Sequence, residues 1–233
     1  MVLGIRPGRA KQYLNFSIFV DMKLVRPLFI AFEGIDGSGK STQARRLEQW
    51  LKENGNNVHL TAEPTKRPIG KMIREIFSGK TKADERVIAG LFVADRLDHI
   101  LNAEEGMMAS LNSGSTVITD RYYLSSYAYH GVHTDMNWVI DANAMAAKLL
   151  RPDITFFIDV TPEVAMERIK ASRESVELYE TLDNLKAVRA KYMEAMEKVG
   201  SEERVVVIDG SLLEEVVARK VIEVVSSEQW VVG

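Results

Sequence analysis

One short segment of the chain brings glycines, a lysine and a hydroxyl residue together at the spacing G-x-x-x-x-G-K-[ST]. It reads Gly34-Ile35-Asp36-Gly37-Ser38-Gly39-Lys40-Ser41, with Thr42 next. Glycine-rich backbone can curl so that several N–H groups point at one anion, and the positive N-terminus of a following helix strengthens such a site. In loops of this kind the lysine lies between the β- and γ-phosphates of a nucleotide, and the hydroxyl group can bind Mg²⁺. The segment therefore predicts a site for a nucleoside triphosphate.

The residues on either side of this loop support the same interpretation. Residues 28–32 form an unbroken apolar run, typical of a strand buried on both faces of a parallel sheet. From Lys40 to Asn54 apolar residues recur at helical spacing, and Gly55 follows as a stop signal. A chance glycine turn between a strand and a helix is the alternative. The combination of strand, loop and helix favours phosphate binding.

A carboxylate stands at the end of another expected strand. The run Thr116 to Thr119 ends at Asp120, and ligand groups in open α/β sheets gather at the carboxyl ends of the strands. Asp120 is therefore a candidate to act on Mg²⁺ through water, beside the Ser41 hydroxyl. Capping of the next helix is the alternative role for an Asp at this place.

Strands and helices alternate along the chain, which predicts a parallel sheet with right-handed crossovers. We expect strands at residues 28–32, 58–61, 116–119, 154–160 and 204–208. We expect helices at residues 40–54, 68–77, 84–111 and 212–225, a helical region between 120 and 150, and a helix that begins at Thr161-Pro162-Glu163. The fold class is a three-layer α/β phosphate-loop NTPase fold, with a five-stranded parallel sheet flanked by helices. One domain over residues 26–233 would follow a flexible extension of residues 1–25, for which a docking arm is the alternative.

Bulk composition narrows the function. The chain has 233 residues, a net charge of −3 and no cysteine. The acidic balance argues against a nucleic-acid binder, and the lack of cysteine excludes disulfides, zinc–thiolate sites and thiol nucleophiles. No apolar run is long enough to span a bilayer, so we expect a cytoplasmic protein without membrane contact. No carboxylate or second histidine stands at metal-ligand spacing on one expected element except at His130 and His133, which we expect in a loop. We expect all four histidines at the surface or behind the site: His59, His99, His130 and His133.

Several motifs in one order resemble the thymidylate kinases, a family of phosphate-loop nucleoside monophosphate kinases. The resemblance runs from about Leu28 to the last helix. The matching stretches are Phe32 to Gln43, Glu63-Pro64, Ile69-Gly70, Ile73-Arg74, Leu91 to Arg96, Asp120-Arg121-Tyr122, Ser125, Ala128, Tyr129, Gly131, Pro152-Asp153, Thr161-Pro162-Glu163 and Glu167-Arg168.

The resemblance implies transfer of the γ-phosphate of ATP to dTMP, giving ADP and dTDP with Mg²⁺ as cofactor, in dTTP synthesis. Phe92 and Arg96 are one helical turn apart and share a helix face; the family implies that they stack on the thymine ring and bond a carbonyl oxygen. It also implies that Arg121 and Asp36 act at the phosphates, with Lys40. Further substrate contacts are implied for Arg74, Ser125, Ser126 and Tyr129.

The family places one more catalytic cation either inside the phosphate loop or in a basic lid. The loop position here is Gly37, so the resemblance assigns the cation to a short lid at about residues 168–182. Arg173 is the candidate, with Arg168 and Lys170 as helpers, although Leu178 stands where related lids carry an Arg. A solvated charge run is the alternative for this segment.

A second departure is Ala62, where many relatives have Arg; Lys66 or Arg67 is the candidate replacement, and the sequence does not decide between them. The family further implies a homodimer. Two other functions stay open: a related kinase with another nucleotide or a deoxynucleoside as acceptor, and a nucleotide-dependent switch protein.

Overall fold

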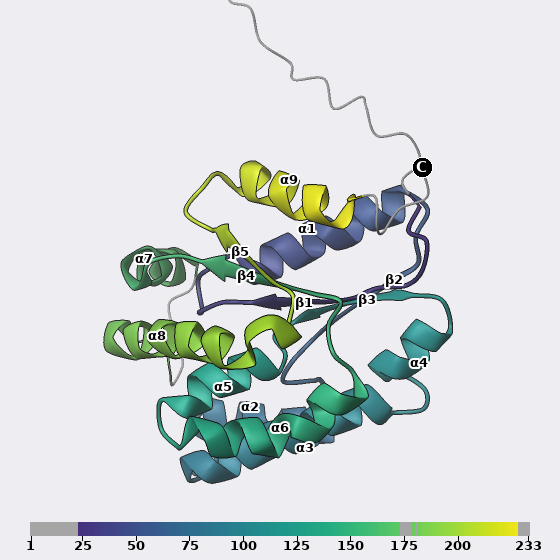
Figure 1. The fold of residues 1–233 in the computed structure, drawn as a ribbon. Coiled ribbons are helices and arrows are strands. Elements are labelled where there is room, and N and C mark those ends of the chain that lie inside the picture. Colours follow the sequence, from purple (N-terminus) through teal and green to yellow (C-terminus); the bar gives the residue numbers. More distant parts are fainter. Residues whose placement is uncertain (1–22, 173–178, 180, 228–233) are drawn as a thin grey trace, which may run out of the picture.

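The computed structural model describes residues 23–172, 179 and 181–227 of the chain. In these residues a five-stranded sheet lies at the centre, and all its strand pairs are parallel. The spatial order is β2-β3-β1-β4-β5 (Figure 1). The strands are β1 (Phe29–Glu33), β2 (Val58–Ala62), β3 (Thr116–Asp120), β4 (Ile154–Asp159) and β5 (Val205–Asp209). The expected α/β fold with a five-stranded parallel sheet is confirmed.

Helices connect the strands and cover both faces of the sheet. They are α1 (Lys40–Glu53), α2 (Pro68–Phe77), α3 (Glu85–Leu101), α4 (Met107–Asn112), α5 (Tyr123–Gly131), α6 (Met136–Leu149), α7 (Pro162–Ser172), α8 (Leu182–Val199) and α9 (Glu214–Val225). A short 3-10 turn, Gly200–Glu202, follows α8.

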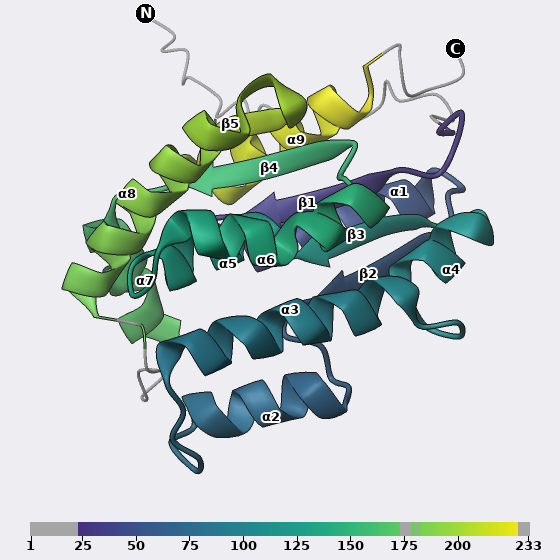
Figure 2. The same cartoon turned by 60° about the horizontal axis from the view of Figure 1, so that its bottom comes forward.

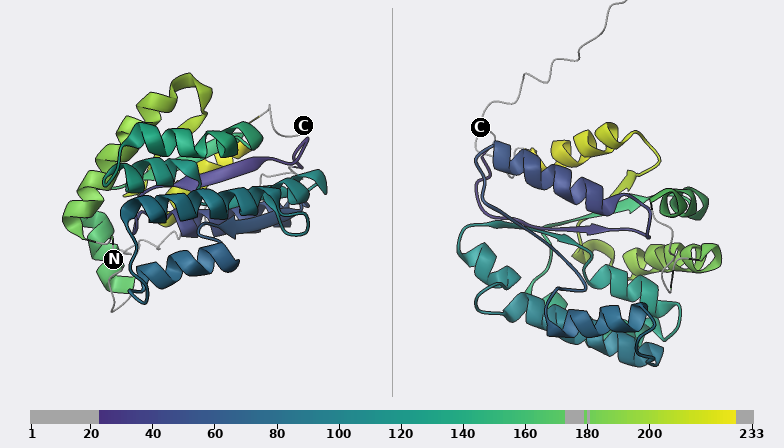
Figure 3. Two further views of the ribbon diagram at one scale, coloured as in Figure 1. Left: turned by 90° about the horizontal axis from the view of Figure 1, so that it is seen from below. Right: turned by 180° about the vertical axis from the view of Figure 1, so that it is seen from behind.

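Two hydrophobic layers hold the helices to the sheet, because successive strand side chains point to opposite faces. Ile30 and Phe32 of β1 pack with α1 and α9 on one face. Phe29 and Ala31 pack on the other face, which α5, α6 and α8 cover with α3 and α4 beside them. Figure 1 and the right view of Figure 3 show α1 and α9 together on one side of the sheet, and α2 packs on the outside of α3 (Figure 2).

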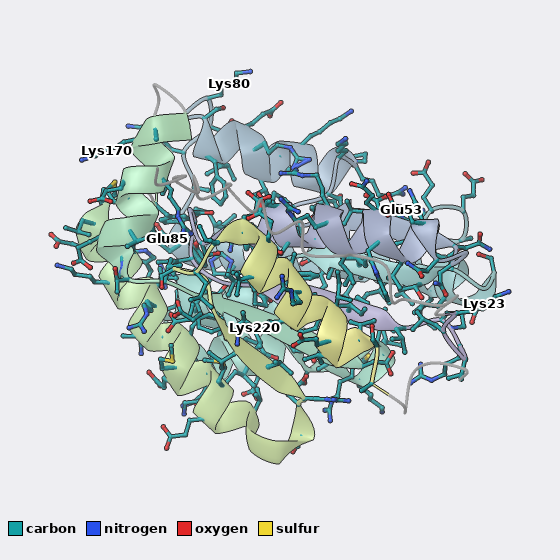
Figure 4. The ribbon with its side chains drawn as sticks, turned by 90° about the horizontal axis from the view of Figure 1, so that it is seen from above. Lys23, Glu53, Lys80, Glu85, Lys170 and Lys220 are labelled. Atoms are coloured by element: carbon teal, nitrogen blue, oxygen red, sulfur yellow. The ribbon has the colours of Figure 1, made fainter. Side chains whose placement is uncertain are left out.

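The outer surface of the α1 and α9 layer is charged. Glu53 on α1 and Lys220 on α9 are exposed, and both are labelled in Figure 4. None of the helices in the described parts of the chain has the length and apolar character that crossing a membrane requires.

Two of the expected helices are wrong in extent. Residues 84–111 form two helices, α3 and α4, because the Asn102 side chain accepts hydrogen bonds from the N–H groups of Glu104 and Glu105 and turns the chain. The helical region between 120 and 150 also divides, into α5 and α6. There the Asp135 side chain accepts a hydrogen bond from the Asn137 N–H and caps the start of α6.

The sheet brings the carboxyl ends of β1 and β3 to the same edge. In the parallel register Phe32 of β1 lies beside Asp120 of β3. The loop after β1, which carries the predicted phosphate-binding segment, therefore meets the loop after β3, which carries Arg121.

Candidate active site

The phosphate loop joins β1 to α1. Its glycines adopt backbone angles that side chains rarely tolerate: φ is 144° at Gly34, 79° at Gly37 and 95° at Gly39. A Cβ atom at Gly37 would lie 2.4 Å from the backbone oxygen of Ala165, so no larger residue fits there without a shift of α7. The loop ends at Lys40, the first residue of α1, and the N–H groups of a first helical turn are open to an anion.

Lys40 is buried against the loop that it serves. Its side chain is 7% exposed, and Nζ lies 3.4 Å from the Ile35 carbonyl oxygen and 3.5 Å from Asp36 Oδ1. Both contacts are long for hydrogen bonds to an ammonium group. A phosphate oxygen at the loop would give this ammonium group a closer partner.

Ser41 and Asp120 meet at the edge of the sheet. The Ser41 hydroxyl donates to Asp120 Oδ2, whereas Asp120 Oδ1 is buried and has no hydrogen-bond partner among the residues that the structure describes. A hydroxyl oxygen and an under-used carboxylate oxygen are ligands that suit Mg²⁺, which binds few protein groups and takes its other ligands from phosphates and water. No group of three or more metal-binding side chains occurs in the described part of the chain.

Asp36, Arg121 and Tyr129 form one cluster beside the phosphate loop. Arg121 donates through Nη2 to Asp36 Oδ1 and to the Tyr129 hydroxyl, the latter at 3.1 Å. The Tyr129 hydroxyl donates to Asp36 Oδ2 at 2.8 Å, and the Arg121 guanidinium lies 4.7 Å from the centre of the Tyr129 ring. Burial alone would raise the pKa of Asp36, but the charges of Arg121 and Lys40 hold this pKa well below its usual value. Asp36 is therefore ionised, and the cluster places an anion and a cation at the mouth of the cavity described next.

The backbone of Arg121 is strained. Its φ is 75°, the only positive value at a non-glycine residue in the described chain. This left-handed conformation costs about 1–2 kcal/mol in an L-residue. Two hydrogen bonds hold it: the Arg121 N–H donates to the Phe32 carbonyl at 2.9 Å, and the Thr119 hydroxyl donates to the Arg121 carbonyl at 2.9 Å. In this backbone conformation the Arg121 side chain reaches Asp36.

A cavity of about 270 Å³ opens next to this cluster. It lies between α5, α3 and the loop after β2. Eight of its lining residues are ones that the sequence proposed for catalysis or substrate contact: Asp36, Arg74, Phe92, Arg96, Arg121, Ser125, Ser126 and Tyr129. The other lining residues were not singled out from the sequence as substrate contacts: Glu63, Pro64, Phe77, His130 and Tyr179.

Arg96 is held rigidly on the cavity wall. Its Nε and Nη2 donate to Glu63 Oε2 at 2.9 and 2.6 Å, and its Nη1 donates to Asn143 Oδ1. The side chains of Arg96 and Glu63 are each 1% exposed. His99 Nδ1 contacts the other Glu63 oxygen at 3.1 Å. The carboxylate of Glu63 therefore neutralises the guanidinium and fixes its direction.

Arg74 and Tyr179 border the same cavity. Arg74 donates to the backbone oxygens of Pro64, at 2.7 Å, and Thr65. The Tyr179 hydroxyl donates to Glu85 Oε2 at 2.6 Å, and its ring meets Phe77 with centres 5.4 Å apart. Tyr179 lies between α7 and α8 and is one of the residues that line the cavity.

Glu33 is a buried carboxylate that the sequence did not single out. Its Oε1 accepts from the backbone N–H groups of Tyr122, at 2.9 Å, and Ser125, at 3.1 Å. Its Oε2 accepts from the hydroxyls of Ser125, at 2.5 Å, and Tyr192, at 2.9 Å. Burial raises the pKa of Glu33, against the lowering effect of these bonds and of Arg121. The carboxylate caps the start of α5 from the end of β1, a contact between distant segments that local sequence patterns do not reveal.

A second cavity, of about 240 Å³, borders the phosphate loop near β5. Arg168 crosses its wall, donating to the Gly210 carbonyl at 2.9 Å and to the Ser38 carbonyl at 3.3 Å. Residues 168–172 of the expected lid thus belong to α7, and Arg168 is bound to backbone oxygens. Arg173, the predicted lid cation, lies outside the described residues.

Lys66 and Arg67 are the candidates to supply the positive charge that Ala62 lacks. Neither lines the cavity beside the Asp36–Arg121–Tyr129 cluster. Arg67 forms ion pairs with Asp98 and Glu105, with Nε 2.5 Å from Asp98 Oδ2. Lys66 is exposed. Both line a wider groove, together with Ala62, Ser41 and Asp120, on the β2 side of the phosphate loop.

His130 corrects one expectation about the histidines. We expected it in a loop, at the surface or behind the site. It lies instead on α5, is 2% exposed and lines the cavity next to Phe92, with ring centres 5.0 Å apart. His99 does lie behind the site, on Glu63.

Comparison with known proteins agrees with this geometry. A sequence profile described as thymidylate kinase matches residues 32–221. The chain belongs to the thymidylate kinase family. It is similar to a probable thymidylate kinase of Thermococcus kodakarensis, with 38% identity over 179 residues that cover 73% of this chain and 84% of the relative. A probable thymidylate kinase of Methanocaldococcus jannaschii is 39% identical over 176 residues, covering 75% and 85%. The thymidylate kinase of Leptospira borgpetersenii is 34% identical over 178 residues, covering 76% and 85%.

Membership in this family makes the chain a kinase. The cavity and the phosphate loop both fall within the matched residues.

Proposed function

We propose that this thymidylate kinase transfers the γ-phosphate of ATP to dTMP, giving ADP and dTDP. The observation that carries the proposal is the position of the Asp36–Arg121–Tyr129 cluster. It lies between the phosphate loop on one side and the cavity lined by Phe92 and Arg96 on the other. A nucleotide monophosphate with its base in the cavity would direct its phosphate at Arg121, toward the donor phosphate at Lys40.

The donor side rests on the phosphate loop. Its N–H groups and Lys40 would hold the β- and γ-phosphates, and the second cavity beside Arg168 is large enough for part of the nucleoside. Ser41 and Asp120 would hold Mg²⁺ together with phosphate oxygens. When bound, the ion supplies positive charge that offsets the charge developing on the transferred group.

The acceptor side rests on aromatic and charged walls. Phe92 offers a ring face to a base, and Arg96 offers fixed N–H donors to a carbonyl oxygen. Ser125 bonds to Arg121 Nη1 at 3.0 Å and so links the cation to α5. Tyr129, packed between Asp36 and Arg121, would lie against the sugar and disfavour a ribose 2′-hydroxyl. Because phosphoryl transfer needs mainly positioning and positive charge, we assign Lys40, Arg121 and Asp36 as catalytic residues.

The remaining cation would come from Arg173. The contact that a side chain at Gly37 would make with Ala165 supports a cation from outside the loop. Replacement of Arg173 by Ala should then lower kcat with little change in either KM. An unchanged kcat would move this role to another residue.

The assay that tests the function measures ADP release with a panel of acceptors: dTMP, dUMP, dCMP, dGMP and thymidine. We expect the highest kcat/KM with dTMP and a complete dependence on Mg²⁺. A preference for another monophosphate or for thymidine would show a related kinase. Slow ATP hydrolysis that no acceptor stimulates would favour the nucleotide-dependent switch.

A homodimer in the cytoplasm completes the proposal. Large apolar side chains are exposed on α3, where Val87 is 52% and Leu101 54% exposed. The same holds for α6, where Trp138 is 42% and Met145 56% exposed. These two helices pack side by side (Figure 2), and exposed apolar patches mark interaction surfaces. Light scattering should give twice the mass of one chain, and Met145→Glu should reduce it.

A further inference from the structure

The Ser125 hydroxyl links the cation of the site to a second carboxylate. Ser125 Oγ accepts a hydrogen bond from Arg121 Nη1 at 3.0 Å and donates to Glu33 Oε2 at 2.5 Å. On its other side, Arg121 donates through Nη2 to Asp36. The guanidinium therefore lies between two carboxylates: Asp36 is in direct contact with it, and Glu33 lies behind one hydroxyl group.

The direction of the Ser125 hydroxyl depends on Glu33. A serine hydroxyl has one proton, and when it gives this proton to a carboxylate its lone pairs remain for other donors. Glu33 Oε1 faces the backbone N–H groups of Tyr122 and Ser125, which can only donate. Glu33 Oε2 accepts from the hydroxyls of Ser125 and Tyr192. This pattern suits an ionised carboxylate, and it leaves a lone pair of Ser125 Oγ for Arg121.

The two charges act on each other across this hydroxyl. Glu33 and Ser125 are buried, and the Arg121 side chain is 16% exposed. Burial raises the pKa of Glu33, whereas the Ser125 bond and the positive charge of Arg121 lower it. Because water is largely excluded here, the attraction between the two charges is stronger than it would be at the surface.

The two supports of the guanidinium use different nitrogen atoms. Arg121 reaches Asp36 and Tyr129 through Nη2 and Ser125 through Nη1. A phosphate that binds Arg121 competes with the Asp36 carboxylate, because the guanidinium fork binds both kinds of anion. The bond to Ser125 stays available when the acceptor phosphate takes the place of Asp36.

We propose that Glu33 is a positioning residue of the transfer reaction, which acts through the Ser125 hydroxyl to keep the Arg121 guanidinium directed at the phosphates. The inference rests on the proposed function, which assigns Arg121 to the phosphates. It adds a role that capping of α5 does not require, because the cap uses Glu33 Oε1 and the link to Arg121 uses Oε2.

Glu33→Gln tests the proposal with a side chain of the same shape. The two backbone N–H groups should hold the amide oxygen, so the amide N–H₂ group would point at Ser125 and Tyr192. The charge behind Arg121 is then lost, and a new donor competes with Arg121 for the Ser125 lone pairs. We expect kcat for dTMP-dependent ADP release to fall about tenfold to a hundredfold, which corresponds to one lost hydrogen bond to a charged group. The KM values for ATP and dTMP should change much less, since the loss concerns the transition state.

A control variant and a double variant separate positioning from a structural role. Tyr192→Phe removes the other hydroxyl that donates to Glu33 Oε2 and leaves the Ser125 bonds to Glu33 and Arg121 in place. Its kcat should stay close to that of wild type. In Arg121→Ala no guanidinium is left to position, so adding Glu33→Gln should not lower kcat further. If the two losses multiply in the double variant, or if Glu33→Gln folds with wild-type kcat, the proposal is overturned.

Thermal unfolding would check that each variant folds. If Glu33→Gln does not fold, Ser125→Ala replaces it, because Ser125→Ala breaks the link and keeps the bonds from Glu33 Oε1 to the backbone. Its loss of kcat should likewise disappear in the Arg121→Ala background, and a loss that persists there would overturn the proposal. Failure of the proposed function has a different signature: wild-type protein would release no ADP in response to dTMP, or Arg121→Ala would keep wild-type kcat.

Discussion

Removal of the Glu63 charge should destabilise the fold and loosen the base site together. Glu63→Gln keeps the volume of the side chain and leaves the Arg96 guanidinium, which is 1% exposed, without its counter-charge. Breaking a buried ion pair on one side costs about 3–5 kcal/mol. We expect about 3 kcal/mol, because the amide oxygen can still accept from Nε or Nη2. For a chain of this size, that loss lowers Tm by about 6–12 °C.

Urea denaturation followed by tryptophan fluorescence would measure the free energy of unfolding, with Glu53→Gln as control. Glu53 is an exposed residue of α1, so its substitution should change stability by less than about 0.5 kcal/mol. The double variant Glu63→Gln/Arg96→Gln removes both charges and should be less destabilised than the sum of the single variants. Glu63→Gln should also raise the KM for dTMP more than the KM for ATP. A stability within 1 kcal/mol of wild type would refute the buried pair.

Three further predictions concern the phosphate loop, the metal and the effect of pH. Lys40→Ala should lower kcat by orders of magnitude with unchanged Tm, as seen in steady-state ADP release and calorimetry; near wild-type turnover would exclude the phosphate-loop assignment. Asp120→Asn should raise the Mg²⁺ concentration needed for half-maximal activity about tenfold or more, since a ligand carboxylate is lost; an unchanged Mg²⁺ titration would place the metal elsewhere. Because the pKa of His130 is lowered to about 3 in the folded state and is about 6.5 in the unfolded chain, the unfolded chain alone takes up this proton as the pH falls below about 6.5. Stability is therefore lost toward acid pH, and between pH 7.5 and 5 the loss should be about 2 kcal/mol smaller in His130→Asn than in wild type.

The sequence predicted best those features of the site that lie within one short segment of the chain. The spacing of Gly34 to Ser41 needs only one strand, one loop and one helix start, so it could be identified without the fold. The alternation of strands and helices was enough to predict the parallel sheet. Pairs such as Phe92 and Arg96 share a helix face, and both line the cavity.

Contacts between distant segments could not be predicted in the same way. The partners of Arg96 are Glu63 and Asn143, which lie 33 and 47 residues away in the chain. No periodic pattern relates them, and only the packing of α3 against α6 and the loop after β2 brings them together. The break between α3 and α4 was missed because the turn depends on the Asn102 side chain, which accepts hydrogen bonds from the N–H groups of Glu104 and Glu105.

The buried carboxylate of Glu33 has a consequence for the timing of catalysis. It joins the end of β1, the first turn of α5 and Tyr192 of α8 into one frame. The phosphate loop follows Glu33 directly in the chain, and Ser125 and Tyr129 lie on α5. Bringing two reactants together in the right geometry costs translational and rotational entropy, and this cost is a large part of the barrier. Reactants that are already bound at the right separation no longer pay it during the reaction. With ATP and dTMP bound as proposed, this frame would set the distance between donor and acceptor when the chain folds, before either nucleotide arrives.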